Sequence, residues 1–327
     1  MNIFVLYFYI MQDNLFDNTE TAFKDKSVFA LYRGYIIFKI ISFPRIVSFV
    51  KFILSFKLIY PLTKLLLKNT MLKQFCGGQN EDDCKNLIQD LNSRNVYSIL
   101  DYSVEGLEDE LSFEETVSRT LNLIELNTSN NFPFIVFKPT GIGRFDLYKK
   151  KSSKAKLCDL EKTEWSKVLS RYDIICDTAQ KKNVSVLIDA EESWIQPIID
   201  EIYENLIVKY NSKKTVVYNT VQAYRTDRLE YLKKLYHTFS STDFHLGVKL
   251  VRGAYMEKER QRARFLNYID PIHKSKNDTD KCFNNCLIFM LENVELFSIF
   301  IGSHNEKSNY LALDYINKYN ITKNKVW

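Results

Sequence analysis

The sequence predicts an α/β chain: an incomplete (βα)8 barrel of the TIM-like kind, with about six strands and the start of a seventh, preceded by N-terminal helices. After residue 95, short apolar runs alternate with longer segments of helical period. Polar residues gather where each apolar run stops. Glycine is scarce, 9 in 327 residues, against about 7% in average proteins, which argues against collagen-like and glycine-rich β architectures. We therefore expect an N-terminal helical region over 1–94 and a barrel over 95–327.

Composition and charge narrow the class of protein. The chain is 46% hydrophobic and 26% charged, as globular proteins are. Forty-five Lys and Arg against 40 Asp and Glu give a net charge of +5, too weak and too mixed to indicate a nucleic-acid partner. The six cysteines are scattered and form no CxxC, so we expect reduced thiols in a cytosol-like compartment. Cys282 and Cys286 would share a helix face, but no second pair with matching spacing follows, which favours core packing over a metal half-site.

The first ten residues form a short apolar run without a basic start or a small-residue cleavage site. They fit neither a secretory signal nor a spanning helix, and they lack the arginines of a mitochondrial transit peptide. Met11 is an alternative start. Residues 34–67 are apolar, are broken by Pro44 and Pro61, and contain no acidic residue. Their basic residues are Lys39, Arg45, Lys51, Lys57 and Lys64.

Two interpretations of segment 34–67 stay open. It forms amphipathic helices packed on the main domain, or it is a basic amphipathic element that lies on a membrane surface.

The barrel prediction depends on the alternation after residue 95. The predicted strands are 96–101, 134–138, 184–189, 216–220, 247–252 and 297–302. The predicted helices are 112–126, 164–182, 195–210, 227–239, 278–294 and 307–319. Continuously apolar strands separated by ten or more helical residues indicate parallel pairing through right-handed crossovers. The chain stops at 325–327, where a seventh strand would begin, so we expect a C-terminally truncated barrel with an open edge.

Polar residues follow all six predicted strands, and this spread favours a barrel over a doubly wound sheet. In a (βα)8 barrel the carboxyl ends of all strands converge on one face, where active sites lie. A doubly wound sheet would concentrate them at one switch point. The polar groups are Asp101; Lys138 and Thr140; Asp189 and Glu191; Gln222 and Tyr224; Arg252 and Tyr255; and Ser303, His304 and Asn305.

A cluster of carboxylates, Asp189, Glu191 and Glu192, follows the third predicted strand. Strand alternation would send Asp189 and Glu191 to one side and Glu192 to the other. Such a pair can act as glycosidase acid and base or bind a metal. Cations near other strand ends favour an ion-pair network instead, either with a ligand or purely structural; they are Lys138, Lys249 and Arg252.

Two other signals for a ligand are weak. Of the histidines only His304 lies at a strand end, and no HxH or HExxH occurs, so no metal is expected. The turn at 141–144 lacks the third glycine of a dinucleotide fingerprint and is interpreted as a βα turn. The segment KLVRGAY, 249–255, is sharper, because two cations, a glycine that permits close backbone approach and a tyrosine follow one another. Cations near a flavin ring stabilise its reduced, anionic form, but a solvated basic turn is the alternative.

The motifs together resemble the proline dehydrogenase family, and in particular its monofunctional bacterial members. They are FDNTETAF (16–23), KQFCGG (73–78), LDYSVEG (100–106), FIVFKPTGIGRF (134–145), VLIDAEESWIQ (186–196), VYNTVQAYRTDRLEYL (217–232), GVKLVRGAYMEKERQRA (247–263) and SHNE (303–306). They occur in the family's order. The resemblance implies the family fold, a distorted (βα)8 barrel with N-terminal helices.

The resemblance also implies a set of site residues and a reaction. The expected reaction is FAD-dependent oxidation of L-proline to 1-pyrroline-5-carboxylate, with a hydride passing to flavin N5 and the electrons to a membrane quinone. The implied catalytic or pocket residues are Lys138, Asp189 and Tyr255, with Glu105 at the pocket mouth. The implied FAD-binding residues are Gln222, Lys249 (where many members have Arg), Arg252, Gly253, Ala254, Ser303 and His304.

We expect a cytoplasmic enzyme, or one that docks through 34–67 on the surface of the inner membrane, which would be the mitochondrial one if the source is eukaryotic. The resemblance also has a departure: the family's eighth strand and its carboxylate-binding YLxRRAxEN helix are not in this sequence. Three hypotheses therefore stand: a truncated proline dehydrogenase, an inactive remnant of one, and a barrel hydrolase using Asp189 and Glu191. Both proline and hydroxyproline are candidate substrates.

Overall fold

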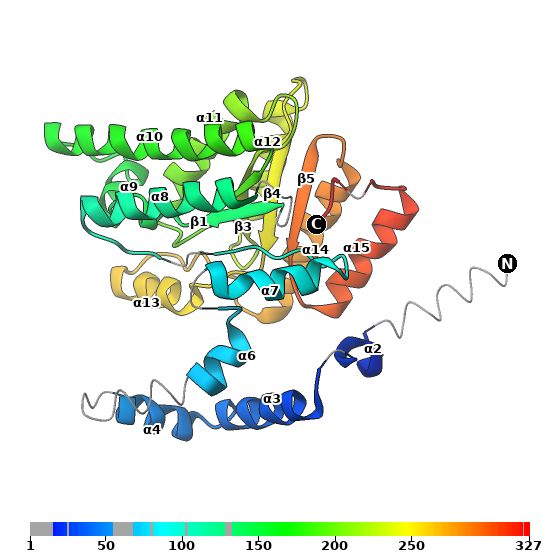
Figure 1. Cartoon of the computed structure of the whole chain (residues 1–327). Coiled ribbons are helices and arrows are strands. Elements are labelled where there is room, and N and C mark those ends of the chain that lie inside the picture. The colour runs from blue at the N-terminus through cyan, green and yellow to red at the C-terminus, as the bar shows by residue number, and fades with distance from the viewer. Residues whose placement is uncertain are drawn as a thin grey trace. The chain divides into compact units, whose positions relative to one another are not determined.

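The computed structural model describes residues 16–24, 26–54, 68–78, 81–101, 104–127, 133–322 and 324–327. The first ten residues, Met11 and 55–67 of the predicted amphipathic segment lie outside this described part. The chain divides into two compact units, 1–96 and 97–327, which are described separately (Figure 1).

The first unit is helical in its described residues. Its elements are α2 (Thr19–Phe23), α3 (Val28–Ile41), α4 (Pro44–Leu54), the π-helical turn η1 (Lys68–Leu72), α6 (Lys73–Phe75) and α7 (Glu81–Asn92). Ser27 begins α3 by accepting a hydrogen bond from the Ala30 amide, and Pro44 stands at the first position of α4, where its missing N–H costs nothing. Among the described residues, no helix is both long and apolar enough to cross a bilayer.

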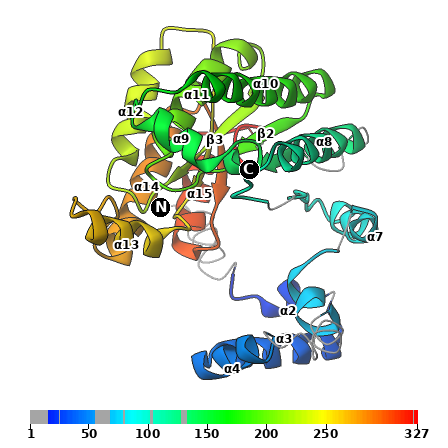
Figure 2. The ribbon, with the colours of Figure 1, turned by 90° about the vertical axis from the view of Figure 1, so that its left-hand side faces the viewer.

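The second unit contains one parallel sheet and the helices that cover it. The strands are β1 (Phe134–Phe137), β2 (Ser185–Ile188), β3 (Val217–Gln222), β4 (Leu246–Val251) and β5 (Phe297–Gly302). The helical elements are α8 (Glu110–Leu126), the 3-10 turn η3 (Pro139–Gly141), α9 (Phe145–Ser152), α10 (Asp159–Lys182), α11 (Gln196–Tyr210), α12 (Arg228–Phe239), α13 (Met256–Leu266), α14 (Lys276–Glu292) and α15 (Glu306–Lys318). Figure 2 shows α8, α10, α11, α12 and α14 in an arc around the strands.

The sheet winds in one direction, as a barrel does. Each strand pairs in parallel with the next one along the chain, in the order β1-β2-β3-β4-β5. A doubly wound sheet would reverse its order at a switch point. Rings of Phe134 on β1 and Phe300 on β5 meet edge to face at 5.3 Å although the two strands are not paired, which shows that the sheet curls until its first and last strands approach. The described strands thus form an α/β architecture of the barrel type.

The prediction of a strand over 96–101 was wrong. Only Asp101 pairs with the sheet, through a single parallel bridge to Val136. Val96 and Tyr97 are about half exposed, so this run is not buried on both faces as a parallel strand requires. At the other edge, Val326 makes one parallel bridge to Ile299, where the start of a seventh strand was predicted.

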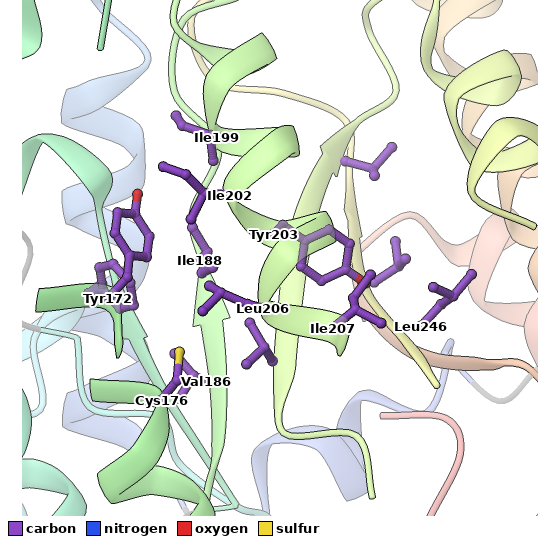
Figure 3. Close-up of a cluster of buried hydrophobic side chains, with 14 of the residues drawn as sticks. Tyr172, Cys176, Val186, Ile188, Ile199, Ile202, Tyr203, Leu206, Ile207 and Leu246 are labelled. Carbon is purple, nitrogen blue, oxygen red and sulfur yellow. The ribbon is translucent and has the colours of Figure 1, made fainter. Parts of the chain in front are cut away.

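Side-chain alternation divides the strands between two cores. Outward residues pack under α10, α11, α12 and α14 in the main core; Figure 3 shows part of it, with Tyr203 and Leu206 of α11 beside Ile188 of β2. Inward residues form a smaller cluster of Phe134, Val136, Leu187 and Tyr218, against which Phe300 packs. The inward cluster fills the middle of the curled sheet, so polar inward positions are left at its two ends.

Candidate active site

A cavity of about 680 Å³ lies at the carboxyl ends of the strands, the end where barrels carry their sites. Ten of the predicted site residues line it: Lys138, Asp189, Gln222, Lys249, Arg252, Gly253, Ala254, Tyr255, Ser303 and His304. Glu105, predicted at the mouth, accepts a hydrogen bond from Tyr255 Oη at 2.9 Å. The structure therefore brings the whole predicted set together.

The strand period explains why these side chains converge. Thr220 and Gln222 follow inward-facing Tyr218 at steps of two on β3, and Lys249 has the same phase on β4. Side-chain caps begin two of the helices near the site, α14 at Ser275 and α15 at Asn305. Asn305 Oδ1 accepts from the Ser308 amide to begin α15, directly after the β5 end.

The centre of the site is a carboxylate held between two lysines. Asp189 Oδ1 accepts from Lys249 Nζ at 2.5 Å, and Asp189 Oδ2 lies 3.5 Å from Lys138 Nζ. Lys138 also lies 3.7 Å from Glu105 Oε2. Burial lowers the pKa of Lys138, but the carboxylates of Asp189 and Glu105 outweigh burial and raise it above its usual value. Two cations thus face two carboxylates, an arrangement balanced enough to receive a zwitterion.

Asp189 and Glu191, predicted to point to the same side, have different surroundings. β2 ends at Ile188, so strand alternation does not continue through residues 189–192. Asp189 lines the cavity, whereas Glu191 is 2% exposed and binds Thr140, whose amide and hydroxyl donate to its two oxygens at 2.9 and 2.6 Å. Burial raises the pKa of Glu191 to about 7, although the bonds from Thr140 oppose this. Glu192 binds Lys258 instead, at 2.9 Å.

Both the nitrogen and the oxygen of the Gln222 side-chain amide form hydrogen bonds within the protein. Its Nε2 donates to the main-chain oxygen of Glu191 at 2.8 Å, and its Oε1 accepts from the Ala254 amide at 3.1 Å. An amide nitrogen carries two N–H groups, so one donor remains for a ligand.

Arg252 ties the end of β4 to two helices. Its Nε donates to Asp280 at 2.6 Å, its Nη1 to Ser303 at 2.8 Å and its Nη2 to Ser308 at 3.0 Å. The guanidinium also lies over the Phe283 ring, 4.3 Å from its centroid. Arg252 does not join the lysine–carboxylate cluster, because Asp280 balances its charge, yet it borders the cavity.

The loop after β4 needs glycine at position 253. Gly253 has φ +133°, and a Cβ there would lie 2.4 Å from the Tyr224 ring. This turn brings Tyr255 back across the cavity toward Glu105. Burial, then the hydrogen bond to Glu105, raises the pKa of Tyr255 well above its usual value, so its hydroxyl stays protonated.

Sequence reasoning assigned no role to Thr220 and left out Asp280. Thr220 lines the cavity and donates to the Ile188 carbonyl at 2.8 Å; its spacing from Gln222 on one strand is a signal that would have found it. Asp280 lies on α14, 28 positions after Arg252, and no local pattern marks it. Cys282 and Cys286 are both buried on α14, in the core as predicted. Among the described residues no group of three or more His, Cys, Asp and Glu side chains is arranged to hold a metal.

Fold and site together define a class: a singly wound parallel α/β barrel domain with a charged ligand cavity at the carboxyl ends of its strands. The family model described as "Proline dehydrogenase" matches residues 84–327. The chain belongs to the proline dehydrogenase family, as the motifs predicted.

Two relatives are similar over most of this chain. The chain is 30% identical over 240 residues to the carbapenem antibiotics biosynthesis protein CarD of Pectobacterium carotovorum, with 73% of this chain and 63% of the relative covered. It is 28% identical to the mitochondrial proline dehydrogenase 1 of Dictyostelium discoideum, over 93% of this chain and 61% of the relative. The chain thus spans about three fifths of each of these two relatives.

Solved structures agree in fold. The crystal structure of proline utilization A from Bdellovibrio bacteriovorus superposes with a TM-score of 0.69 at 18% identity, over 80% of this chain and 28% of that one. At this level of identity the similarity shows the architecture alone.

Proposed function

We propose that the chain is a flavin-dependent dehydrogenase that oxidises L-proline to 1-pyrroline-5-carboxylate in the cavity at the carboxyl ends of β1–β5. The observation that carries the proposal is Asp189 held between Lys138 and Lys249 inside that cavity, within the segment that matches the family. Proline is a zwitterion, so it needs one anionic and one cationic partner close together. Asp189 would accept from its ammonium group and Lys138 would face its carboxylate.

The residues present fit FAD. A bound flavin would supply the acceptor for the hydride that leaves the ring carbon next to the proline nitrogen. Lys249 offers the positive charge that favours electron uptake, and Gln222 retains one free N–H. Gly253 lets the backbone come close to a flat ring without a Cβ in the way. Arg252, Ala254, Ser303 and His304 would complete the flavin contacts, because they border the same cavity.

The chain's own groups contribute position and charge. Tyr255 would cover the substrate, held by its bond to Glu105. The substrate amine would lose its proton to solvent before the hydride leaves the neighbouring ring carbon, and Asp189, held by Lys249, would keep the amine in place. Preorganised charges of this kind lower the barrier because they need not reorient during the reaction.

The test is the visible absorption spectrum of the purified 327-residue chain, recorded with and without proline. The proposal predicts a flavin spectrum that bleaches when proline is added in the absence of an electron acceptor. Bleaching by hydroxyproline but not proline would change the substrate; a relative from Xenopus laevis, 25% identical over 341 residues, is named hydroxyproline dehydrogenase. A chain that binds flavin but bleaches with neither would support the inactive-remnant alternative. Turnover of a glycoside without flavin would support the hydrolase.

A membrane quinone is the proposed electron acceptor, and the first unit offers a surface for docking. Between residues 27 and 54 the chain has no acidic residue, while Arg33, Lys39, Arg45 and Lys51 are basic. Six aromatic side chains of α3 and α4 are more than half exposed: Phe29, Tyr32, Tyr35, Phe38, Phe49 and Phe52. Aromatic and basic groups on one helical segment favour anionic lipid surfaces. Flotation with anionic but not with neutral vesicles would support this, and its loss in Phe49→Ser/Phe52→Ser would assign it to α4.

A further inference from the structure

Glu191 is a buried carboxylate that the proposed reaction does not use. Its side chain does not line the cavity, and it is 2% exposed. Both of its oxygens accept from one residue, Thr140, which is itself 1% exposed. Burying an ionisable group costs free energy unless it is fully hydrogen-bonded. The other hydrogen bonds that Thr140 makes indicate what this buried pair does.

Thr140 fixes the loop that carries Glu105. The Gly106 amide donates to Thr140 Oγ1 at 2.9 Å, and the Leu107 amide donates to the Thr140 carbonyl at 3.2 Å. The neighbouring Gly141 completes the contact, because a Cβ there would lie 2.7 Å from the Val104 carbonyl oxygen. The loop over residues 104–107 therefore lies directly on the turn after β1.

The main chain of Glu191 reaches the opposite wall of the cavity. Its carbonyl accepts from Gln222 Nε2, and Gln222 Oε1 accepts from the amide of Ala254. Tyr255 follows Ala254 and donates to Glu105. Residues from five separate strand ends and loops thus close a hydrogen-bonded ring beside the cavity, in which Thr140, Glu191 and Gln222 are the buried members.

We propose that Glu191 is a positioning residue: through Thr140 on one side and Gln222 on the other, it holds Glu105 against Tyr255 across the cavity mouth and so sets substrate affinity. The inference rests on the proposed function only for the identity of the substrate. The ring itself is a property of the folded chain. Its loss should weaken binding of the small zwitterion and leave the groups at the centre of the cavity in place.

The first test is amide hydrogen exchange at Gly106 and Leu107, which needs neither flavin nor proline. In Thr140→Val the hydroxyl is lost at nearly constant volume, and we expect exchange at Gly106 to quicken at least tenfold. Thr140→Ser should keep the protection. Thr215→Val is the matched control, because Thr215 is also buried and hydroxyl-bonded, to Ser298 at 2.7 Å, but lies at the other end of the strands.

Glu191→Leu is tested in the same way against Glu259→Leu. Glu259 is a fully buried carboxylate that accepts from the amide and hydroxyl of Ser193, as Glu191 does from Thr140, but it does not touch loop 104–107. We expect faster exchange at Gly106 and Leu107 in Glu191→Leu alone. Equal acceleration in both variants would mean general destabilisation and would overturn the proposal.

The second readout is the division between KM and kcat with proline. Thr140→Val should raise KM at least fivefold and change kcat less than twofold, and Thr140→Ser should restore both. A fall in kcat at constant KM would contradict a positioning role at the mouth. If the exchange results hold and the wild-type chain oxidises no proline, the ring stands and the proposed function fails.

Discussion

The two ends of the strands hold cavities of similar size and different chemistry. The cavity at the carboxyl ends has about 680 Å³, and a second one at the amino ends has about 630 Å³. Both contain lysines. At the carboxyl ends Lys138 lies between Asp189 and Glu105, and these carboxylates raise its pKa. At the amino ends Lys214 donates to the side-chain and main-chain oxygens of Asn183, and burial lowers its pKa.

Cavity volume alone therefore does not distinguish the candidate active site from the cavity at the amino ends. Lys325, also at the amino ends, donates to the carbonyl of Glu295, and burial lowers its pKa in spite of the nearby carboxylate. Partly buried lysines that are bonded only to neutral acceptors cost free energy, because their charge is desolvated without a directly paired opposite charge. Lysines paired with carboxylates instead form preorganised ion pairs that can bind a charged ligand. The aromatic inward cluster separates the two ends.

Phe134→Ala should have the largest effect, because it removes the centre of the separating layer. The Phe134 ring is 2% exposed and meets Tyr218, Phe300 and Trp327 edge to face at 5.2–5.3 Å. Loss of a buried Phe costs about 3–5 kcal/mol, measured as the free energy of unfolding in urea. Phe265→Ala is the control, since Phe265 is 87% exposed and should change that free energy by less than about 0.5 kcal/mol. Equal effects would show that the packing of Phe134 in this layer does not stabilise the fold.

Asp189→Asn should abolish most of the activity while the fold persists. It leaves Lys138 and Lys249, each 18% exposed, facing each other without the shared carboxylate. We expect kcat/KM for proline to fall about 100-fold, or about 2.7 kcal/mol of transition-state stabilisation. An artificial electron acceptor serves for the assay, and circular dichroism confirms folding. A kcat/KM within threefold of the wild-type value would contradict the proposal that Asp189 is central to substrate binding and catalysis.

We expect the free energy of unfolding of the wild-type chain to depend on pH through Glu191, and this dependence to be absent in Glu191→Gln. Its pKa in the folded chain is about 7, above the value near 4.5 expected when unfolded. The folded state therefore binds the proton more tightly, so the contribution of Glu191 is fully present below pH 4.5 and is lost as pH rises to 7. The difference in unfolding free energy between wild type and Glu191→Gln should change by at most about 1.4 kcal/mol per pH unit in that window. A flat difference would place the folded pKa near its ordinary value.

Much of this arrangement could be predicted because it follows from strand and helix periods. The run 297–302 coincides with β5, since a buried parallel strand is continuously apolar. Helix α13 was not predicted, because its sequence MEKERQRARFL has no apolar stripe; only Glu259 and Ala263 are buried. The site residues at strand ends could be predicted because they directly follow these apolar runs in the sequence. The partners of Arg252 and Glu191 were not, because Asp280 and Thr140 reach them through tertiary packing, which leaves no local pattern.

Lys214→Met should have the smallest effect and completes the comparison. Partial burial already lowers the pKa of Lys214, and its acceptors are neutral, so an apolar side chain of similar length removes the charge without leaving an unpaired carboxylate. We expect kcat/KM to change less than twofold and the free energy of unfolding to change by less than about 0.5 kcal/mol. Lys138→Met, the same replacement at the other end, leaves Asp189 and Glu105 without one cation and should lower kcat/KM at least tenfold. If both variants lost activity equally, the charge distribution at the carboxyl ends would have no special place in function.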